Sequence, residues 1–180
     1  KNIEVIQGDL YETIYLAWGC FWCIEGAFDT KPGVISAISG YAGGKASTAN
    51  YDSITTGKTA HRETVKVTYN PDVLSKEEVL DTFFWYIDPY DTGGQFADRG
   101  YQYTTAVFYT NEEEKQEILD YINNHEFEDN LATKFVEITS FYEAEEYHQD
   151  YAQKKSGNYE KYFKWSGRKD YVDENKDKYK

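Results

Sequence analysis

The chain has 180 residues, a length that suits one folded domain with a substantial core. It carries 19 Lys and Arg against 32 Asp and Glu, a formal net charge of −13, which argues against nucleic-acid binding because phosphates attract cationic surfaces. It has no run of about 18 apolar residues, which excludes a membrane-spanning helix.

The start of the chain shows no basic segment followed by an apolar one, so no signal peptide is visible and a cytoplasmic location is favoured. The chain begins at Lys1 and not at methionine. A removed leader, and with it export, is therefore compatible with the sequence, as is a longer parent polypeptide.

The first 109 residues alternate between strand-like and helix-like patterns. They predict a strand over 13–18, a helix over 20–28, strands over 34–39 and 63–69, a helix opened by a capping box at Ser75–Glu78, and a strand over 103–109. This βαββαβ order predicts an α+β fold with a ferredoxin-like core and a mixed sheet. Two long loops, one over 40–61 and one beginning at Gly93, are expected to be functional.

The rest of the chain predicts extra helices and one more strand. We expect a helix over 111–123, a strand over 134–139 and a helix over 144–155. Residues from about 156 to 180 are charged and lack a period, which predicts a long C-terminal coil wrapped on the surface. We expect residues 1–180 to form one domain.

The two cysteines lie three residues apart, in Cys20-Phe21-Trp22-Cys23, at a strand-to-helix junction. Free N–H groups at a helix start stabilise a thiolate, so we expect Cys20 to have a lowered pKa. Residues three apart on a helical turn bring their Cα atoms to roughly 5 Å, so Cys20 and Cys23 can form a disulfide.

This spacing leaves several kinds of site open. An inert buried pair, half of a zinc site, a thioredoxin-like redox pair and a pair of attacking and resolving thiols all use it. Zinc would need two more ligands, and the three histidines, His61, His125 and His148, form no H-x3-5-H pair, so we expect no metal site. Trp18 lies one residue too far upstream for a thioredoxin-like motif.

Further motifs accompany the cysteines at plausible spacing over roughly residues 13–150. They are Gly19-Cys20-Phe21-Trp22 with Glu25, Gly40-Tyr41-Ala42-Gly43-Gly44, Asn50-Tyr51, the segment from Gly57 to Glu63, the segment from Gln95 to Gly100, and the segment from Tyr142 to Gln149. In these motifs the chain resembles the A-type peptide-methionine sulfoxide reductases. Cys and Trp are scarce residues, which makes a match in several parts specific.

The resemblance implies that the chain reduces methionine S-sulfoxide, in proteins or as the free amino acid, to methionine. The Cys20 thiolate would attack the sulfoxide sulfur and become a sulfenic acid. Phe21 and Trp22 would form the apolar wall that holds the substrate methyl group.

The resemblance also assigns the groups that act on the sulfoxide oxygen. Glu63 would protonate this oxygen, Tyr51 and Tyr103 would hydrogen-bond it, and Asp98 would help to orient the site. The chemistry is reasonable, because a sulfoxide is a poor electrophile until its oxygen is protonated or strongly hydrogen-bonded. A carboxyl group among aromatic side chains has a raised pKa and can be an acid near neutral pH.

The chain departs from the common pattern in its second cysteine. Many relatives carry Gly at the position of Cys23 and a recycling cysteine near the C-terminus, where this chain has none. We therefore expect Cys23 to resolve the sulfenic acid and the disulfide to be reduced by thioredoxin or an equivalent dithiol, with no bound cofactor. The Ser166-Gly167-Arg168 segment is similar to members fused to, or working beside, a B-type reductase domain.

Two other functions stay open from the sequence. A general dithiol-disulfide oxidoreductase would exchange disulfides without reducing sulfoxides. A redox-sensor or metal-binding module would oxidise reversibly or bind zinc without turnover. Only the sulfoxide reductase needs both Glu63 and Tyr51.

Overall fold

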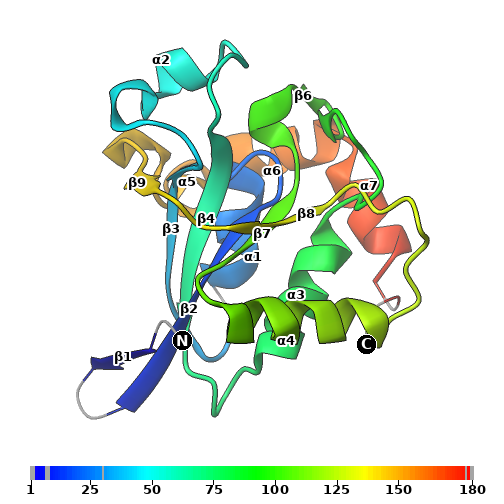
Figure 1. Ribbon diagram of the computed structural model, residues 1–180. Coiled ribbons are helices and arrows are strands. Elements are labelled where there is room, and N and C mark those ends of the chain that lie inside the picture. Colours follow the sequence, from blue (N-terminus) through cyan, green and yellow to red (C-terminus); the bar gives the residue numbers. More distant parts are fainter. Residues whose placement is uncertain (1–2, 7–8, 30, 177, 179–180) are drawn as a thin grey trace.

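A mixed seven-stranded sheet with helices packed against it forms the fold of the computed structural model, which describes residues 3–6, 9–29, 31–176 and 178 (Figure 1). The strands lie in the order β8-β7-β2-β4-β3-β9, and β1 pairs with β2. Among the described residues of this sheet, β7 and β8 pair in parallel and the other strand pairs are antiparallel. The strands of this sheet are β1 (Ile3–Ile6), β2 (Asp9–Ala17), β3 (Val34–Ala42), β4 (Arg62–Tyr69), β7 (Ala106–Tyr109), β8 (Lys134–Glu137) and β9 (Phe141–Glu143).

The predicted α+β class and βαββαβ core are confirmed. β2, α1 (Trp22–Asp29), β3, β4, α3 (Lys76–Tyr86) and β7 follow one another along the chain, and the four strands lie in the ferredoxin-like order β7-β2-β4-β3. Leu16 fixes the register at the centre, opposite Val65 on one side and Val107 on the other.

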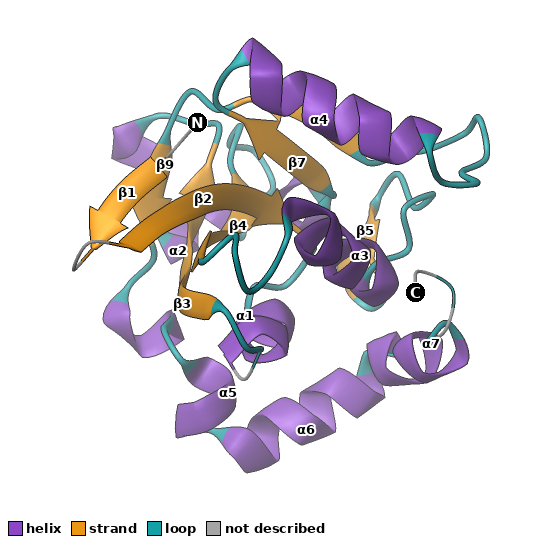
Figure 2. Cartoon of the chain, turned by 90° about the horizontal axis from the view of Figure 1, so that it is seen from below, coloured by secondary structure: helices purple, strands orange, loops and turns teal. Residues whose placement is uncertain are grey.

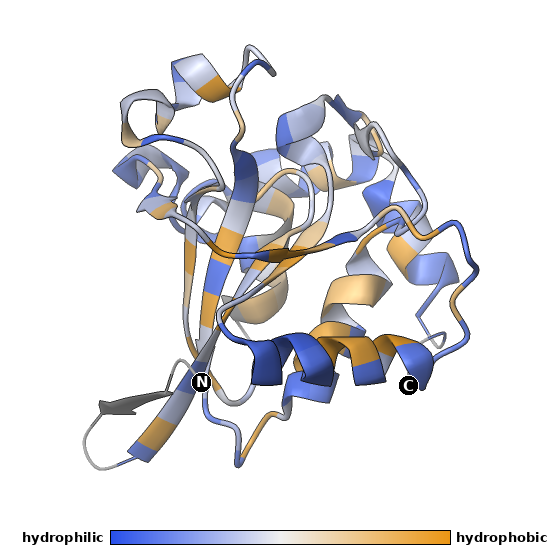
Figure 3. Cartoon of the chain, in the orientation of Figure 1, coloured by the Kyte–Doolittle hydropathy of each residue, from blue (hydrophilic) through white to orange (hydrophobic). Residues whose placement is uncertain are grey.

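The main core lies between this sheet and the helices. Ile14, Leu16, Val65 and Val67 point from β2 and β4 into one cluster with apolar residues of α1, α3 and α4 (Glu112–Asn123). Figure 3 shows the apolar residues along the central strands and α3, and the acidic first turn of α4 on the outside. Burial on this face therefore decides which residues of β2 and β4 point inward.

Side chains cap the starts of α3 and α4, and the sequence predicts the first of these two caps. The Ser75 hydroxyl accepts the Glu78 N–H at 3.1 Å, and the Glu78 carboxylate accepts the Ser75 N–H at 3.3 Å, which confirms the capping box. Asn111 caps α4 by accepting the Glu114 N–H at 2.9 Å.

The two long loops contain short elements that the sequence pattern does not predict. The first holds a 3-10 turn (Ala46–Thr48) and α2 (Tyr51–Ile54), which Asn50 caps by accepting the Ser53 N–H. The second holds the two-stranded sheet of β5 (Gly94–Gln95) and β6 (Asp98–Arg99) and a 3-10 turn (Tyr101–Tyr103). The strand predicted over 103–109 begins only at Ala106, because this turn occupies its start.

The predicted C-terminal coil is wrong, because the tail forms two helices, α6 (Ser156–Trp165) and α7 (Arg168–Glu174). Figure 2 shows α6 passing α1, and α7 lying near α3. One face of α6 carries the aromatic residues Tyr159, Tyr162 and Phe163, which contact the rest of the chain. These contacts stabilise the helix, although most of its other residues are charged or polar. Residues 177, 179 and 180 of the expected tail lie outside the described residues.

The continuous helix predicted over 144–155 is also wrong. A 3-10 turn (Glu146–His148) and α5 (Tyr151–Lys154) replace it. The helical conformation is interrupted at Asp150, whose φ of 53° is left-handed. The Gln149 side-chain amide accepts the Ser39 N–H at 2.9 Å and donates to the Ser39 carbonyl at 2.8 Å. Pairing with the sheet therefore outweighs local helix propensity here. Within the described residues, no helix is long and apolar enough to span a membrane.

Candidate active site

Both cysteines are buried where β2 leads into α1. Gly19, with a φ of 96°, turns the chain after β2, and Cys20 lies two residues before the first residue of α1. Cys20 is 5% exposed and Cys23 is fully buried, and neither forms a disulfide in this structure. The two residues lie three apart across one turn, where the Cys23 N–H donates to the Cys20 carbonyl at 3.1 Å, a spacing that allows a disulfide to form without a large rearrangement.

The expectation of a lowered pKa for Cys20 is wrong for the site in this state. Burial raises the pKa of the Cys20 thiol, and so do the hydrogen bond with Cys23 and the negative charges of Glu63 and Asp98. The helix start does not offset these effects, because the Phe21 N–H donates to Glu63 instead of to the sulfur. Protonation of Glu63 removes one of these effects and makes a negative charge on Cys20 less unfavourable.

Cys23 behaves in the opposite way. The hydrogen bond from Cys20 lowers the pKa of the Cys23 thiol, and the Arg168 guanidinium lowers it further, against the effect of burial. In the resting pair, Cys23 is therefore the thiol that ionises first.

Glu63 lies at the start of β4 and its carboxyl group is buried beside the cysteines. The residue is 2% exposed, and its Oε2 accepts the Phe21 N–H at 3.2 Å. Burial raises the pKa of Glu63 well above its ordinary value, and the negative charge of Asp98 adds to the effect. Among the described residues, the second carboxyl oxygen has no hydrogen-bond partner, so a proton on it is free to be donated to a substrate.

The structure brings Tyr51, Tyr103 and Asp98 to the same site. They come from α2, from the 3-10 turn before β7 and from β6, so both long loops contribute. Burial and the charges of Glu63 and Cys20 raise the pKa of both tyrosines, which stay protonated hydrogen-bond donors. Asp98 accepts the Tyr162 hydroxyl, and burial raises the pKa of its carboxyl group.

Phe21 and Trp22 form an aromatic wall with His148. Phe21 is buried, and its ring centroid lies 5.1 Å from that of His148. The Trp22 indole donates to His148 Nδ1 at 3.0 Å and stacks on Tyr151 with centroids 4.3 Å apart. The hydrogen bond to His148 fixes the orientation of the Trp22 ring.

Sequence reasoning missed four side chains that contact the site. The Glu145 carboxylate accepts the Tyr51 N–H at 2.9 Å and the Tyr41 hydroxyl at 2.8 Å, which positions α2. Tyr159, Tyr162 and Arg168 reach the site from the tail, which was predicted as coil. The aromatic spacing 159, 162, 163 is the sequence signal that could have found this helix.

The arrangement combines a nucleophilic thiol, a protonated acid, two phenol donors and a second thiol in a nearly dry site. Such a set can attack an electrophilic centre bonded to oxygen, protonate that oxygen and then close a disulfide. In the described part of the chain, no group of three or more His, Cys, Asp or Glu side chains is placed to hold a metal ion.

Sequence comparisons point to one family. Residues 12–180 match the peptide methionine sulfoxide reductase family. The chain is 43% identical over 168 residues to the peptide methionine sulfoxide reductase MsrA/MsrB of Vibrio cholerae. The aligned region covers 91% of the chain but 44% of the Vibrio protein. It is 39% identical over 168 residues to MsrA of Bacillus subtilis, covering 91% of the chain and 94% of that protein.

Comparisons with solved structures agree. Mxr1 from Saccharomyces cerevisiae in its reduced form is 30% identical and superposes with a TM-score of 0.78 over 87% of this chain and 91% of Mxr1. The same yeast protein in complex with Trx2 is 25% identical over 84% of this chain and 91% of Mxr1, with a TM-score of 0.55. On its sequence, its fold and the contents of its site, the chain belongs to the peptide methionine sulfoxide reductase family.

Proposed function

We propose that the chain carries out its family's reaction, the reduction of methionine sulfoxide to methionine, on the S epimer and with Cys20 as the nucleophile. The observation that carries this proposal is the burial of Glu63 beside Cys20, with the Phe21 N–H bound to one carboxyl oxygen at 3.2 Å. A carboxyl group with a raised pKa next to a thiol provides an acid and a nucleophile in one pocket.

In the first step, the Cys20 sulfur attacks the sulfoxide sulfur while Glu63 gives its proton to the sulfoxide oxygen. Tyr51 and Tyr103 donate hydrogen bonds to that oxygen as negative charge develops on it. The oxygen moves to Cys20 as a sulfenic acid, the sulfoxide is reduced by two electrons, and methionine leaves. Phe21 and Trp22 hold the methyl group, and Asp98 orients the site through the Tyr162 hydroxyl.

In the second step, the Cys23 thiolate attacks the Cys20 sulfur. The S–S bond forms, the S–O bond breaks, and the hydroxyl group takes up one proton from solvent and leaves as water. An external dithiol then reduces the Cys20–Cys23 disulfide and is itself oxidised. We assign this role to a thioredoxin-like protein, in line with the complex of yeast Mxr1 with Trx2.

The substrate is methionine sulfoxide as the free amino acid or in oxidised proteins. A general dithiol-disulfide oxidoreductase would leave the buried Glu63 and the tyrosines Tyr51 and Tyr103 without a role. We also propose that residues 1–180 work as one reductase domain, because the tail contacts Cys23 and Asp98. The likeness to the Vibrio MsrA/MsrB protein, of which the chain spans 44%, supports a B-type reductase domain as a fused or separate partner.

Turnover of each epimer of a blocked methionine sulfoxide with dithiothreitol tests the function. We expect wild type to reduce the S epimer, Cys20→Ser to be inactive, and Glu63→Gln to lose about 10²–10⁴-fold in rate. Cys23→Ser should keep dithiothreitol-driven turnover and lose thioredoxin-driven recycling. Reduction of neither epimer by wild type, with disulfide exchange retained, would replace the proposal with a general oxidoreductase.

A further inference from the structure

The Arg168 guanidinium is a buried cation that the mechanism above leaves unused. Arg168 is the first residue of α7 and is 1% exposed. It donates to the Trp18 carbonyl at 2.9 Å and to the Tyr86 carbonyl at 2.7 Å, and it lies 4.9 Å from the centroid of the Phe96 ring. These contacts fix the guanidinium plane from three sides.

The guanidinium is held directly against the backbone that precedes the cysteines. A Cβ atom at Gly19 would come within 2.7 Å of Arg168 Nη2, so only glycine admits this approach. The positive charge of the same guanidinium also acts on Cys23 and lowers the pKa of its thiol. Arg168 is thus bonded to the residue before Gly19 and packs against Gly19 itself, directly before Cys20.

Arg168 has no carboxylate partner at ion-pair distance in the described part of the chain. Asp98, the acidic group that feels its charge, accepts the Tyr162 hydroxyl instead. Burying a guanidinium with only carbonyl partners is unfavourable, because carbonyls do not neutralise its charge. A negative charge that appears during turnover would remove this cost.

We propose that Arg168 is a positioning residue that holds Cys23 as a thiolate for attack on the Cys20 sulfenic acid. The proposal rests on the role of Cys23 in the proposed function. It also sets the direction of recycling, because a thiolate stabilised by Arg168 is the better leaving group when an external thiolate attacks the disulfide. The partner's sulfur therefore bonds Cys20, and Cys23 leaves.

Several groups act on Cys23 together with Arg168. Cys20 precedes α1, Glu63 lies on β4, Asp98 on β6, and Tyr159 and Tyr162 on α6. Glu63 and Asp98 carry or can acquire negative charge and disfavour the thiolate, and Tyr159 binds the Cys23 carbonyl. Among the charged groups that face the Cys23 sulfur, Arg168 is the one cation that the described residues provide.

Three variants separate the charge of Arg168 from its contacts. Arg168→Gln removes the charge and keeps amide donors for the two carbonyls, and Arg168→Lys keeps the charge with fewer donors. Lys169→Met is the matched control, because it removes a cation from the next position of α7, where Lys169 is exposed and pairs with Asp173. Thermal unfolding establishes that each variant is folded.

Single-turnover kinetics with one equivalent of methionine S-sulfoxide give the main readout. Arg168→Gln should form methionine at a rate within about twofold of wild type and close the disulfide about tenfold more slowly at neutral pH, the effect of one pKa unit. The pH at which disulfide formation is half-maximal should shift upward, and the sulfenic acid should accumulate to be trapped by dimedone. Arg168→Lys should restore most of the rate, and Lys169→Met should match wild type.

A direct titration covers the case in which Arg168→Gln folds poorly. In the Cys20→Ser background, thiolate ultraviolet absorbance, corrected with the variant that lacks both cysteines, follows Cys23 alone. The titration midpoint should rise with Arg168→Gln and stay near its starting value with Arg168→Lys. The proposal is overturned if Arg168→Gln leaves the titration midpoint of Cys23 unchanged. It is also overturned if Arg168→Gln slows methionine formation and disulfide formation equally. Wild type that forms no methionine refutes the proposed function instead, and a Cys23→Ser enzyme with unchanged recycling refutes the role of Cys23.

Discussion

Glu63 shows how one buried side chain links activity to pH. Its pKa is raised chiefly by burial, and its proton is the one that the sulfoxide oxygen needs. The rate of methionine formation should therefore fall as pH rises through the raised pKa of Glu63. Neither the ionised carboxylate nor an amide can provide that proton.

The same shift makes a prediction for stability. Above its ordinary pKa of 4.5, Glu63 keeps its proton in the folded protein and loses it in the unfolded chain. Folding is therefore favoured by this group at low pH, and that contribution is lost as pH rises through the folded-state pKa. Glu63→Gln removes the dependence, so its free energy of unfolding relative to wild type should increase from about pH 4.5 upward.

Urea unfolding of wild type and Glu63→Gln between about pH 4.5 and 8 measures this difference. Glu113→Gln is the control, because it changes an exposed acid in the first turn of α4. A stability difference that is flat in pH would mean that Glu63 ionises in the folded protein near its ordinary pKa.

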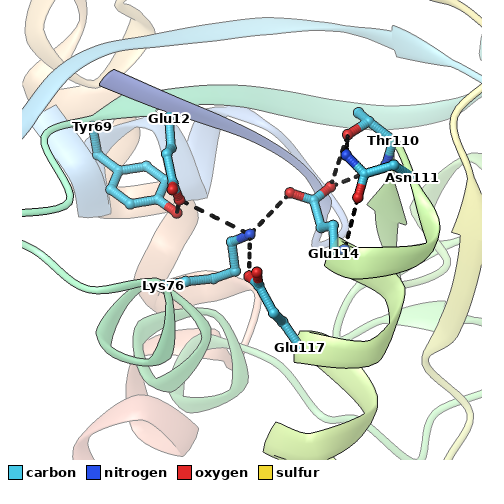
Figure 4. Close-up of polar contacts among 7 residues, drawn as sticks. All are labelled: Glu12, Tyr69, Lys76, Thr110, Asn111, Glu114 and Glu117. Carbon is cyan, nitrogen blue, oxygen red and sulfur yellow. Dashed lines mark hydrogen bonds and ion pairs between the residues drawn. The ribbon is translucent and has the colours of Figure 1, made fainter. Parts of the chain in front are cut away.

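At the scale of elements, one lysine joins two helices to the sheet. Lys76 Nζ, at the start of α3, lies 2.6 Å from Glu117 and 3.1 Å from Glu114 of α4, and 3.9 Å from Glu12 of β2 (Figure 4). The Tyr69 hydroxyl of β4 donates to Glu12 at 2.9 Å. Burial lowers the pKa of Lys76, but the hydrogen bonds and charges of Glu117 and Glu114 outweigh it and raise the pKa overall.

Replacing this lysine should leave a buried carboxylate without its cation. The side chain of Glu114 is 3% exposed and that of Lys76 is 12% exposed, so Lys76→Met should cost about 2–4 kcal/mol of unfolding free energy. Lys76→Met/Glu114→Gln should recover part of this loss, because the unpaired charge is gone. Lys115→Met, which removes a more exposed cation of α4, should stay within about 0.5 kcal/mol of wild type. Urea unfolding of the two single variants and the double variant measures the coupling. If the free-energy changes of the single variants add up to that of the double variant, Lys76 and Glu114 are not coupled.

The elements that the sequence predicted well are those with local causes. The capping box of Ser75 and Glu78 and the alternation in β4 depend on neighbours in the chain, so they can be recognised from the sequence. β9 could not be predicted, because it is three residues long and exists through pairing with Gly40–Ala42. The break at Asp150 likewise depends on the Gln149 amide bonding Ser39.

The candidate site divides in the same way. Its residue set was predicted from motifs, and the fold brings Cys20, Glu63, Tyr51, Tyr103 and Asp98 together. The pKa of Cys20 was predicted in the wrong direction, because it depends on burial and on charges from other elements rather than on the helix start alone. The contribution of the tail was missed because it also depends on contacts between elements that are far apart in the sequence.

At the scale of the whole molecule, the tail closes the site. Tyr159 binds the Cys23 carbonyl at 3.3 Å, Tyr162 binds Asp98, and Arg168 binds the carbonyls of Trp18 and Tyr86. Trp85 of α3 donates to the Val172 carbonyl of α7 at 2.8 Å. These contacts cover α1 and α3 from outside, and Cys23 in α1 is fully buried.

A chain that ends after Lys155 should therefore lose both stability and protection of its thiols. Each lost hydrogen bond contributes ~1 kcal/mol, and apolar contacts of Tyr162 and Phe163 add to the loss, so Tm should fall by roughly 10 °C or more. Alkylation of Cys23 should become faster, and turnover of the S epimer should be lost with the positions of Asp98 and Cys23. Trp165→Ala is the control within the tail, since Trp165 is 74% exposed and its loss should leave Tm and turnover near wild type. Calorimetry and timed alkylation decide the matter: a truncated chain with the Tm, thiol protection and turnover of wild type would show that residues beyond 155 are an appendage and not part of the reductase domain.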